Sequence, residues 1–78
     1  MKKRADPKET KRDKFIRLAN HRTNAVFRQL KILGNCSNRY AYDYDEDDVN
    51  KIFKEIEKRV KETKTKFQSS LKKEFRLQ

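Results

Sequence analysis

Six side chains that could form a phosphate-binding surface recur at intervals of three and four residues. They are Lys14, Arg17, His21, Asn24, Arg28 and Lys31. At about 100° per residue, this spacing places them in one row along an α-helix. Lysine and arginine neutralise phosphates, arginine also pairs bidentately with guanine, and asparagine pairs with adenine. The row therefore predicts a nucleic-acid-binding face, for which a solvated helix face is the alternative.

The charge balance of the chain also favours an acidic partner. The 78 residues include 22 lysines and arginines against 12 aspartates and glutamates, which gives a net charge of +10. Two basic segments, residues 1–31 and 49–78, flank an acidic junction in which Arg39 is the only cation. Residues 1–6 form a basic arm that can follow phosphates without being folded. Arg39 is a further candidate for contact with nucleic acid.

A second basic row lies in the C-terminal segment, at Lys51, Lys54, Lys58 and Lys61. Glutamates flank this row at i,i+4 spacing from cations, which predicts the pairs Glu55–Arg59, Glu57–Lys61 and Glu62–Lys66. A balanced face of this kind is more typical of a solvated helix. Because lysine is a point charge with little base selectivity, we expect phosphate contact at most.

Tyrosines alternate with other residues in the junction, at positions 40, 42 and 44. A period of two predicts an extended segment whose three rings point to one side. Beside Arg39, the rings of Tyr40 and Tyr42 are candidates for stacking on unpaired bases. The alternative is that the tyrosines cover the end of a small core.

Catalysis has little support in the sequence. His21 is the only histidine and Cys36 the only thiol, and neither has a second base nearby. The acidic cluster of residues 43–48 lacks the spacing of a calcium loop, so helix capping explains it better than a metal site. A single glycine leaves no phosphate-cradling loop. We therefore expect no enzymatic activity, no metal and no cofactor.

The basic row requires a long first helix, which we predict over residues 7–33. Asp6 is the expected N-cap, with Pro7 in the first turn and Glu9 completing a capping box. Gly34 follows the last apolar residue and is expected to end the helix in the left-handed conformation, a role that Asn35 could share. The apolar face of this helix comprises Phe15, Leu18, Ala19, Ala25, Val26, Leu30 and Leu33, widened on one side by Ile16 and Phe27.

A second helix is predicted over residues 46–75. Asp45 is the expected N-cap, with Asp48 three residues later, and the acidic first turn complements the helix dipole. Its apolar residues form a narrow stripe that suits packing along one seam. They are Val49, Ile52, Phe53, Ile56, Val60, Thr63, Phe67, Leu71 and Phe75.

Together these elements predict an all-α protein with a single domain over residues 7–78. We expect an antiparallel, coiled-coil-like two-helix hairpin, joined by an ordered, extended junction at residues 34–45. Few large apolar side chains are available for a core, so a homodimer or a larger partner should stabilise the fold. The chain has neither an apolar run that could span a membrane nor a recognisable secretion signal, so we expect a cytoplasmic protein.

Several stretches of the sequence carry a resemblance to other proteins. They are Phe15-Ile16-Arg17-Leu18-Ala19-Asn20-His21-Arg22, Leu33-Gly34-Asn35-Cys36-Ser37-Asn38-Arg39-Tyr40, Tyr42-Asp43-Tyr44 and Val49-Asn50-Lys51-Ile52-Phe53. Over about residues 12–67 the chain resembles a group of short, uncharacterised bacterial proteins that are often encoded near mobile elements. The resemblance implies that the junction has a fixed structure, and it implies nothing about activity.

The leading expectation is a small, non-catalytic protein that binds DNA or RNA through the phosphate backbone. The alternative is a protein-binding module that uses Ile16, Phe27 and the tyrosines as anchors, such as an inhibitor of a nucleic-acid enzyme. An origin near mobile elements would make a host-defence modulator plausible, since small helical anti-CRISPR proteins have a similar size. A membrane-surface helix fits less well, because the second helix needs its narrow stripe for packing.

Overall fold

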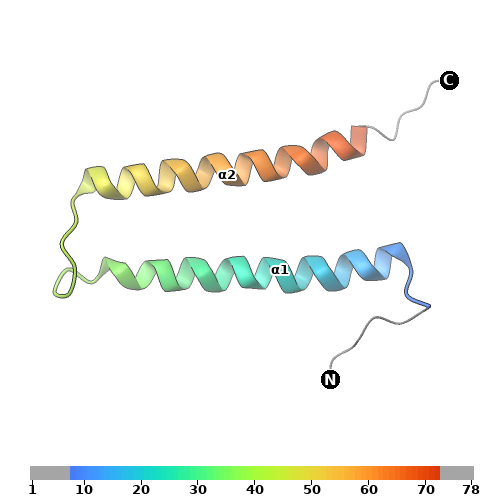
Figure 1. Ribbon diagram of the computed structural model, residues 1–78, viewed down its shortest axis with the longest axis horizontal. Coiled ribbons are helices and arrows are strands. Elements are labelled where there is room, and N and C mark those ends of the chain that lie inside the picture. Colours follow the sequence, from blue (N-terminus) through green and yellow to red (C-terminus); the bar gives the residue numbers. More distant parts are fainter. Residues whose placement is uncertain (1–7, 73–78) are drawn as a thin grey trace. The chain divides into compact units, whose positions relative to one another are not determined.

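The computed structural model describes residues 8–72. It contains α1 (Lys11–Gly34), a short 3-10 helix η1 (Asn35–Ser37) and α2 (Glu46–Lys72), as Figure 1 shows. Every regular element within these residues is helical, which confirms the predicted all-α class. The chain divides between Tyr42 and Asp43 into two units, each with one long helix. The basic arm at residues 1–6 lies outside the described residues.

Helix α1 begins at Lys11, four residues later than predicted. Thr10 is the N-cap: its Oγ1 accepts from the backbone N–H of Asp13 at 2.9 Å, and Asp13 Oδ2 accepts from the N–H of Thr10 at 3.3 Å. This reciprocal box satisfies backbone donors that the helix leaves unpaired. The prediction of a capping box at Glu9 was wrong, because Glu9 precedes the helix. Asp6 and Pro7 lie outside the described residues.

The end of α1 is confirmed to within one residue, but the predicted left-handed cap was wrong. Gly34 is itself helical, with φ −58° and ψ −24°, and the C-cap Asn35 has φ −67° and ψ −17°. The N–H of Asn35 donates to the carbonyls of Ile32 and Leu33, and the chain tightens into η1. The 3-10 turn thus satisfies the last carbonyls without a residue of positive φ.

The junction after η1 begins with a hydrogen-bonded turn, so the prediction of an extended segment was wrong for its first half. The Asn38 carbonyl accepts from the N–H groups of Ala41 at 3.1 Å and Tyr42 at 3.0 Å. The Asn38 side chain accepts from the Tyr40 N–H at 3.0 Å, as expected for a residue that satisfies backbone groups near a helix end. In this junction, Asn38 and the stretch from Tyr42 to Asp45 lie outside both turn and helix. The alternation of tyrosines did not indicate extended structure here, because the asparagine side chain stabilises a turn instead.

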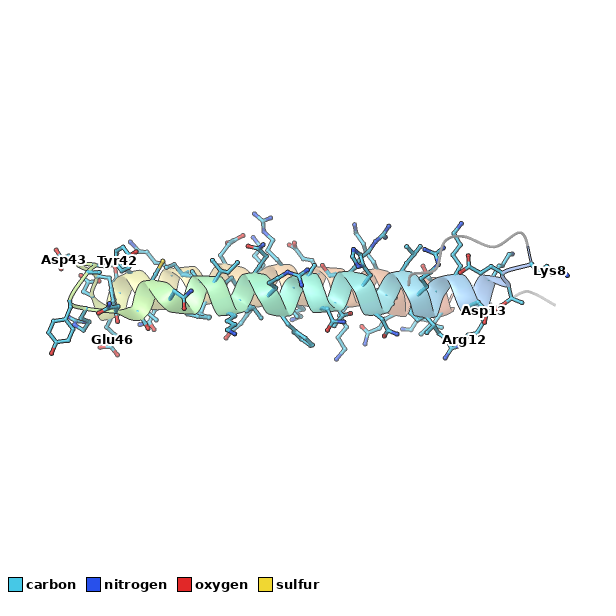
Figure 2. The ribbon with its side chains drawn as sticks, turned by 90° about the horizontal axis from the view of Figure 1, so that it is seen from below. Lys8, Arg12, Asp13, Tyr42, Asp43 and Glu46 are labelled. Carbon is cyan, nitrogen blue, oxygen red and sulfur yellow. The ribbon has the colours of Figure 1, made fainter. Side chains whose placement is uncertain are left out.

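The start of α2 agrees with the prediction. The Asp45 side chain accepts from the N–H of Asp48 at 2.9 Å, and Asp48 accepts from the N–H of Asp45 at 3.0 Å. Figure 2 labels Glu46, the first residue of the helix, and Asp43, three residues earlier in the chain. Acidic side chains in this turn lie at the positive end of the helix dipole. The structure describes α2 to Lys72, so Phe75 of the predicted stripe lies outside the described residues.

No residue in the described part of the chain is fully buried. The apolar residues of both helices are exposed or half-buried. On α2, Val49 and Ile56 are half-buried, whereas Phe67 is 56% exposed. One helix cannot enclose its own apolar face, so these side chains need a second surface to be removed from water.

The backbone of Gly34 allows a direct test of how α1 ends. A Cβ atom at Gly34 would meet no other atom within 4 Å, and the conformation is one that alanine adopts freely. We expect Gly34→Ala to raise the free energy of unfolding by about 0.4–1 kcal/mol, by restricting the unfolded chain. Urea unfolding followed by circular dichroism measures the change. A clear destabilisation would indicate the left-handed conformation and contradict the helical end.

Candidate nucleic-acid interface

The six residues of the predicted basic row all lie within α1, and we call them the α1 row. They are Lys14, Arg17, His21, Asn24, Arg28 and Lys31. Because the helix is continuous from Lys11 to Gly34, their spacing keeps them on one side of it. All are exposed except Arg17, which is half-buried. The helix therefore positions the row as the sequence predicts.

Arg17 differs from the rest of the α1 row because it is held by a carboxylate. Its Nε donates to Glu9 Oε2 at 2.7 Å and its Nη2 donates to Glu9 Oε1 at 2.9 Å. The side chains are only 31% and 14% exposed, respectively, so this is the least exposed ion pair in the described structure. A bidentate pair of this geometry uses the same donors that would bind a phosphate or a guanine.

The pair shifts the protonation equilibria of both groups. Hydrogen bonds from Arg17, followed by its charge, lower the pKa of Glu9, although partial burial opposes the shift. The hydrogen bond to Glu9 raises the pKa of Arg17 in turn. Both changes favour the charged forms, so the pair is intact at neutral pH.

The other five members of the α1 row have no such partner. Within residues 8–72, no hydrogen bond or ion pair engages the side chains of Lys14, His21, Asn24, Arg28 or Lys31. The sequence contains no acidic residue from position 14 to position 42. Three full positive charges on this face are therefore available to an anionic ligand.

The remaining predicted contact residues lie beyond α1, in the turn that follows it. Arg39 and Tyr40 belong to the turn, and Tyr42 ends it. Tyr40 is fully exposed at 102%, Tyr42 is 53% exposed and Tyr44 is half-buried. The three rings thus do not share one environment, and Tyr40 covers no core. Helix α1 places the six residues of the α1 row on one face. Arg39, Tyr40 and Tyr42 are not on that helix.

The lysine face of α2 is partly neutralised. Arg59 Nε donates to Glu55 Oε2 at 2.8 Å, which confirms one predicted pair, and Lys51 lies 3.4 Å from Asp47. The hydrogen bond to Glu55 raises the pKa of Arg59. The other predicted pairs, Glu57–Lys61 and Glu62–Lys66, are not within ion-pair distance in this part of the structure. This face matches a solvated helix surface more closely than the α1 row does.

The contact that sequence reasoning missed is the one between Glu9 and Arg17. Helical spacing rules pair residues three or four apart, and these two are eight apart. The contact forms because Glu9 lies before the first turn of α1 and is free to fold back along it. The signal in the sequence was the box of Thr10 and Asp13, which places the helix start after Glu9. A second missed contact is the Arg12 guanidinium, 5.8 Å from the centre of the Phe15 ring.

Over residues 8–72, no group of three or more histidine, cysteine or acidic side chains is arranged to hold a metal ion. The same residues include no helix that is long and apolar enough to span a membrane. No known protein family, curated protein or solved structure matches the chain. The candidate site therefore rests on the geometry and charge of α1.

The Glu9–Arg17 pair predicts a shifted titration. Because the pKa of Glu9 is lower in the folded chain than in the unfolded chain, the pair stabilises the fold above the ordinary glutamate pKa. That contribution disappears as the pH falls through the lowered value. We expect NMR of the Glu9 carboxyl carbon to give a midpoint below the ordinary glutamate range. Arg17→Gln should raise this midpoint, and equal midpoints in both proteins would contradict the contact.

Proposed function

We propose that this chain is a small, non-catalytic, cytoplasmic protein that binds nucleic acid through the phosphate backbone. The α1 row supplies the contacts: Lys14, Arg28 and Lys31 neutralise phosphates, and Asn24 is the candidate reader of a base. The observation that carries the proposal is that, within residues 8–72, Glu9 is the one acidic side chain that pairs with this row. A long run of unpaired cations adds little stability to a helix face that only contacts water. When such cations bind an anionic polymer, counterions are released from the polymer, and this release favours binding.

The fold that we propose for this function is an antiparallel helical hairpin with coiled-coil-like packing. The pattern of α2 supports it, since the stripe from Val49 to Phe67 is narrow and regular enough to pack along one seam. Thr63 does not interrupt the stripe with an unpaired hydroxyl, because its Oγ1 donates to the Arg59 carbonyl at 2.9 Å. The apolar face of α1 is the matching surface within the chain. Packing the two faces together would leave the α1 row in solvent.

A second candidate function is supported by the exposure of Tyr40. Three backbone N–H groups donate to Asn38 and hold the turn that presents this ring, so little backbone freedom would be lost on binding. An exposed, ordered tyrosine is a typical anchor of a protein interface. The alternative is therefore a protein-binding module, for example an inhibitor of a nucleic-acid enzyme encoded near mobile elements.

The salt dependence of binding tests the primary proposal. We expect fluorescence anisotropy with a labelled DNA duplex and a labelled RNA to show affinity that falls steeply with salt. The triple variant K14Q/R28Q/K31Q should reduce the slope of log affinity against log salt by about 2.7, at about 0.9 per lost phosphate contact.

The matched control is K54Q/K58Q/K61Q, which removes the same charge from α2. We expect it to change the slope by less than about 1, because those lysines lie outside the α1 row. Equal effects of the two variants would indicate non-specific attraction by net charge. A flat salt response, with nuclease-resistant capture of a protein that Tyr40→Ala abolishes, would favour the protein-binding alternative.

The Glu9 carboxylate predicts a gain of affinity on its removal. Glu9→Gln frees the Arg17 guanidinium to join the α1 row, and one added phosphate contact should strengthen binding about fivefold at physiological salt. Glu55→Gln is the control, because it removes the same charge and releases Arg59 on α2. We expect that control to change affinity by less than about twofold. Equal gains in both variants would contradict a specific role for Arg17.

A further inference from the structure

The apolar side chains of α1 are too widely spread to pack on a single partner helix. One group, centred on Phe15, Leu18 and Leu33, lies on one side of the helix. A second group lies roughly a third of a turn away from it at about 100° per residue. We call this group the second seam: Ile16, Ala19, Thr23, Phe27 and Leu30. A narrow stripe such as that of α2 can cover only one of the two groups.

Four of the five residues of the second seam are exposed to solvent, and Ala19 is half-buried. Ile16 is 41%, Leu30 43% and Phe27 60% exposed, and Thr23 is also exposed. Its members follow one another at intervals of three and four residues, which is the spacing of a helix that packs lengthwise against another helix. This spacing favours packing of the second seam against another helix of similar length.

We propose that this partner is the second seam of another copy of the chain, with the two α1 helices antiparallel. The inference rests on the proposed function, because it concerns how the α1 row is displayed. Antiparallel pairing centred near residue 22 places Ile16 opposite Phe27 of the second copy. It likewise places the small residues Ala19 and Thr23 opposite each other, so large and small side chains alternate along the contact.

Polar residues on one border of the seam fit the same arrangement. Asp13 lies in the first turn of α1 and Lys31 in the last, and both fall on the border between the second seam and the α1 row. Pairing centred near residue 22 brings Asp13 of each copy to Lys31 of the other, and Asn20 to Asn24. A parallel pair would instead place each charge beside its own like charge. Charge complementarity thus favours the antiparallel orientation.

The antiparallel orientation of the two α1 helices determines on which side of the dimer the α1 rows lie. Two identical antiparallel helices are related by a two-fold axis perpendicular to the plane that contains them. The α1 row lies roughly a third of a turn from the second seam, so it faces one side of that plane. The two-fold axis keeps the row of the second copy on the same side. The dimer therefore presents Lys14 and Arg28 of both copies as one basic surface, with each Lys31 paired to Asp13 of the other copy at its border and helix axes about 8–10 Å apart.

Cysteine cross-linking tests both the dimer and its orientation, in a Cys36→Ser background because Cys36 is exposed. Thr23 lies next to the two-fold axis, so Thr23→Cys should form a disulfide-linked dimer under mild oxidation. Ile16→Cys should not cross-link alone, because its two copies would be about 18 Å apart along the helices. A mixture of Ile16→Cys and Phe27→Cys should cross-link. Self-linking of Ile16→Cys, or no link in Thr23→Cys, would overturn the proposal.

A second measurement uses no cysteine. Sedimentation of the unmodified chain, without nucleic acid, should give twice the chain mass of 9.5 kDa at micromolar concentration. Phe27→Gln should shift the chain to monomer with at least about a tenfold weaker association. Ile32→Gln is the matched control, since Ile32 is similarly exposed at 51% but lies outside the second seam. A monomeric parent chain, or equal losses in both variants, would refute the interface.

Salt separates this inference from the proposed function. Added salt screens repulsion between two chains of net charge +10, so it should leave dimerisation intact or strengthen it, while nucleic-acid binding weakens. Salt-sensitive binding by a monomer would overturn the dimer and leave the proposed function standing. A cross-linked dimer that binds no nucleic acid would support the interface and reject the function.

Discussion

The constraint on which this protein depends is that a lone amphipathic helix cannot remove its own apolar side chains from water. Both long elements of the chain are of this kind, and no residue in the part of the chain that the structure describes is fully buried. Local interactions fix where each helix begins, through Thr10 for α1 and Asp45 for α2. What stabilises the fold must therefore come from joining apolar faces, within a chain or between chains.

Electrostatics adds a second constraint, because the same helices are strongly charged. On α2 the cations alternate with glutamates, and Arg59 is held by Glu55. On α1 the cations from Lys14 to Lys31 have one acidic partner among the described residues, Glu9, and it lies before the helix. Any association that brings basic faces close to one another is opposed by repulsion. If these faces contact an anionic ligand instead, the same positive charges attract the ligand and increase its affinity.

Much of the helical structure could be predicted from the sequence, because it follows from local patterns. Periodicity located both helices and the α1 row, and Asp45 with Asp48 marked the start of α2 correctly. The errors arose where two local signals competed. Asp6 and Thr10 both resemble N-caps, and only the structure shows that the helix follows Thr10. Likewise the period of the tyrosines suggested extended structure, but hydrogen bonds to Asn38 fold the segment into a turn. The Glu9–Arg17 contact spans eight residues and corresponds to no helical spacing.

The position of the α1 start has an effect on charge as well as on structure. If the helix extended back through Glu9, residues 9 and 17 would lie about 12 Å apart along its axis, too far for their side chains to share two hydrogen bonds. The carboxylate reaches the guanidinium only because the chain leaves the helical path at Thr10. The Thr10 cap thus allows Glu9 to hold the Arg17 guanidinium, so the start of the helix and the net charge that α1 exposes are linked.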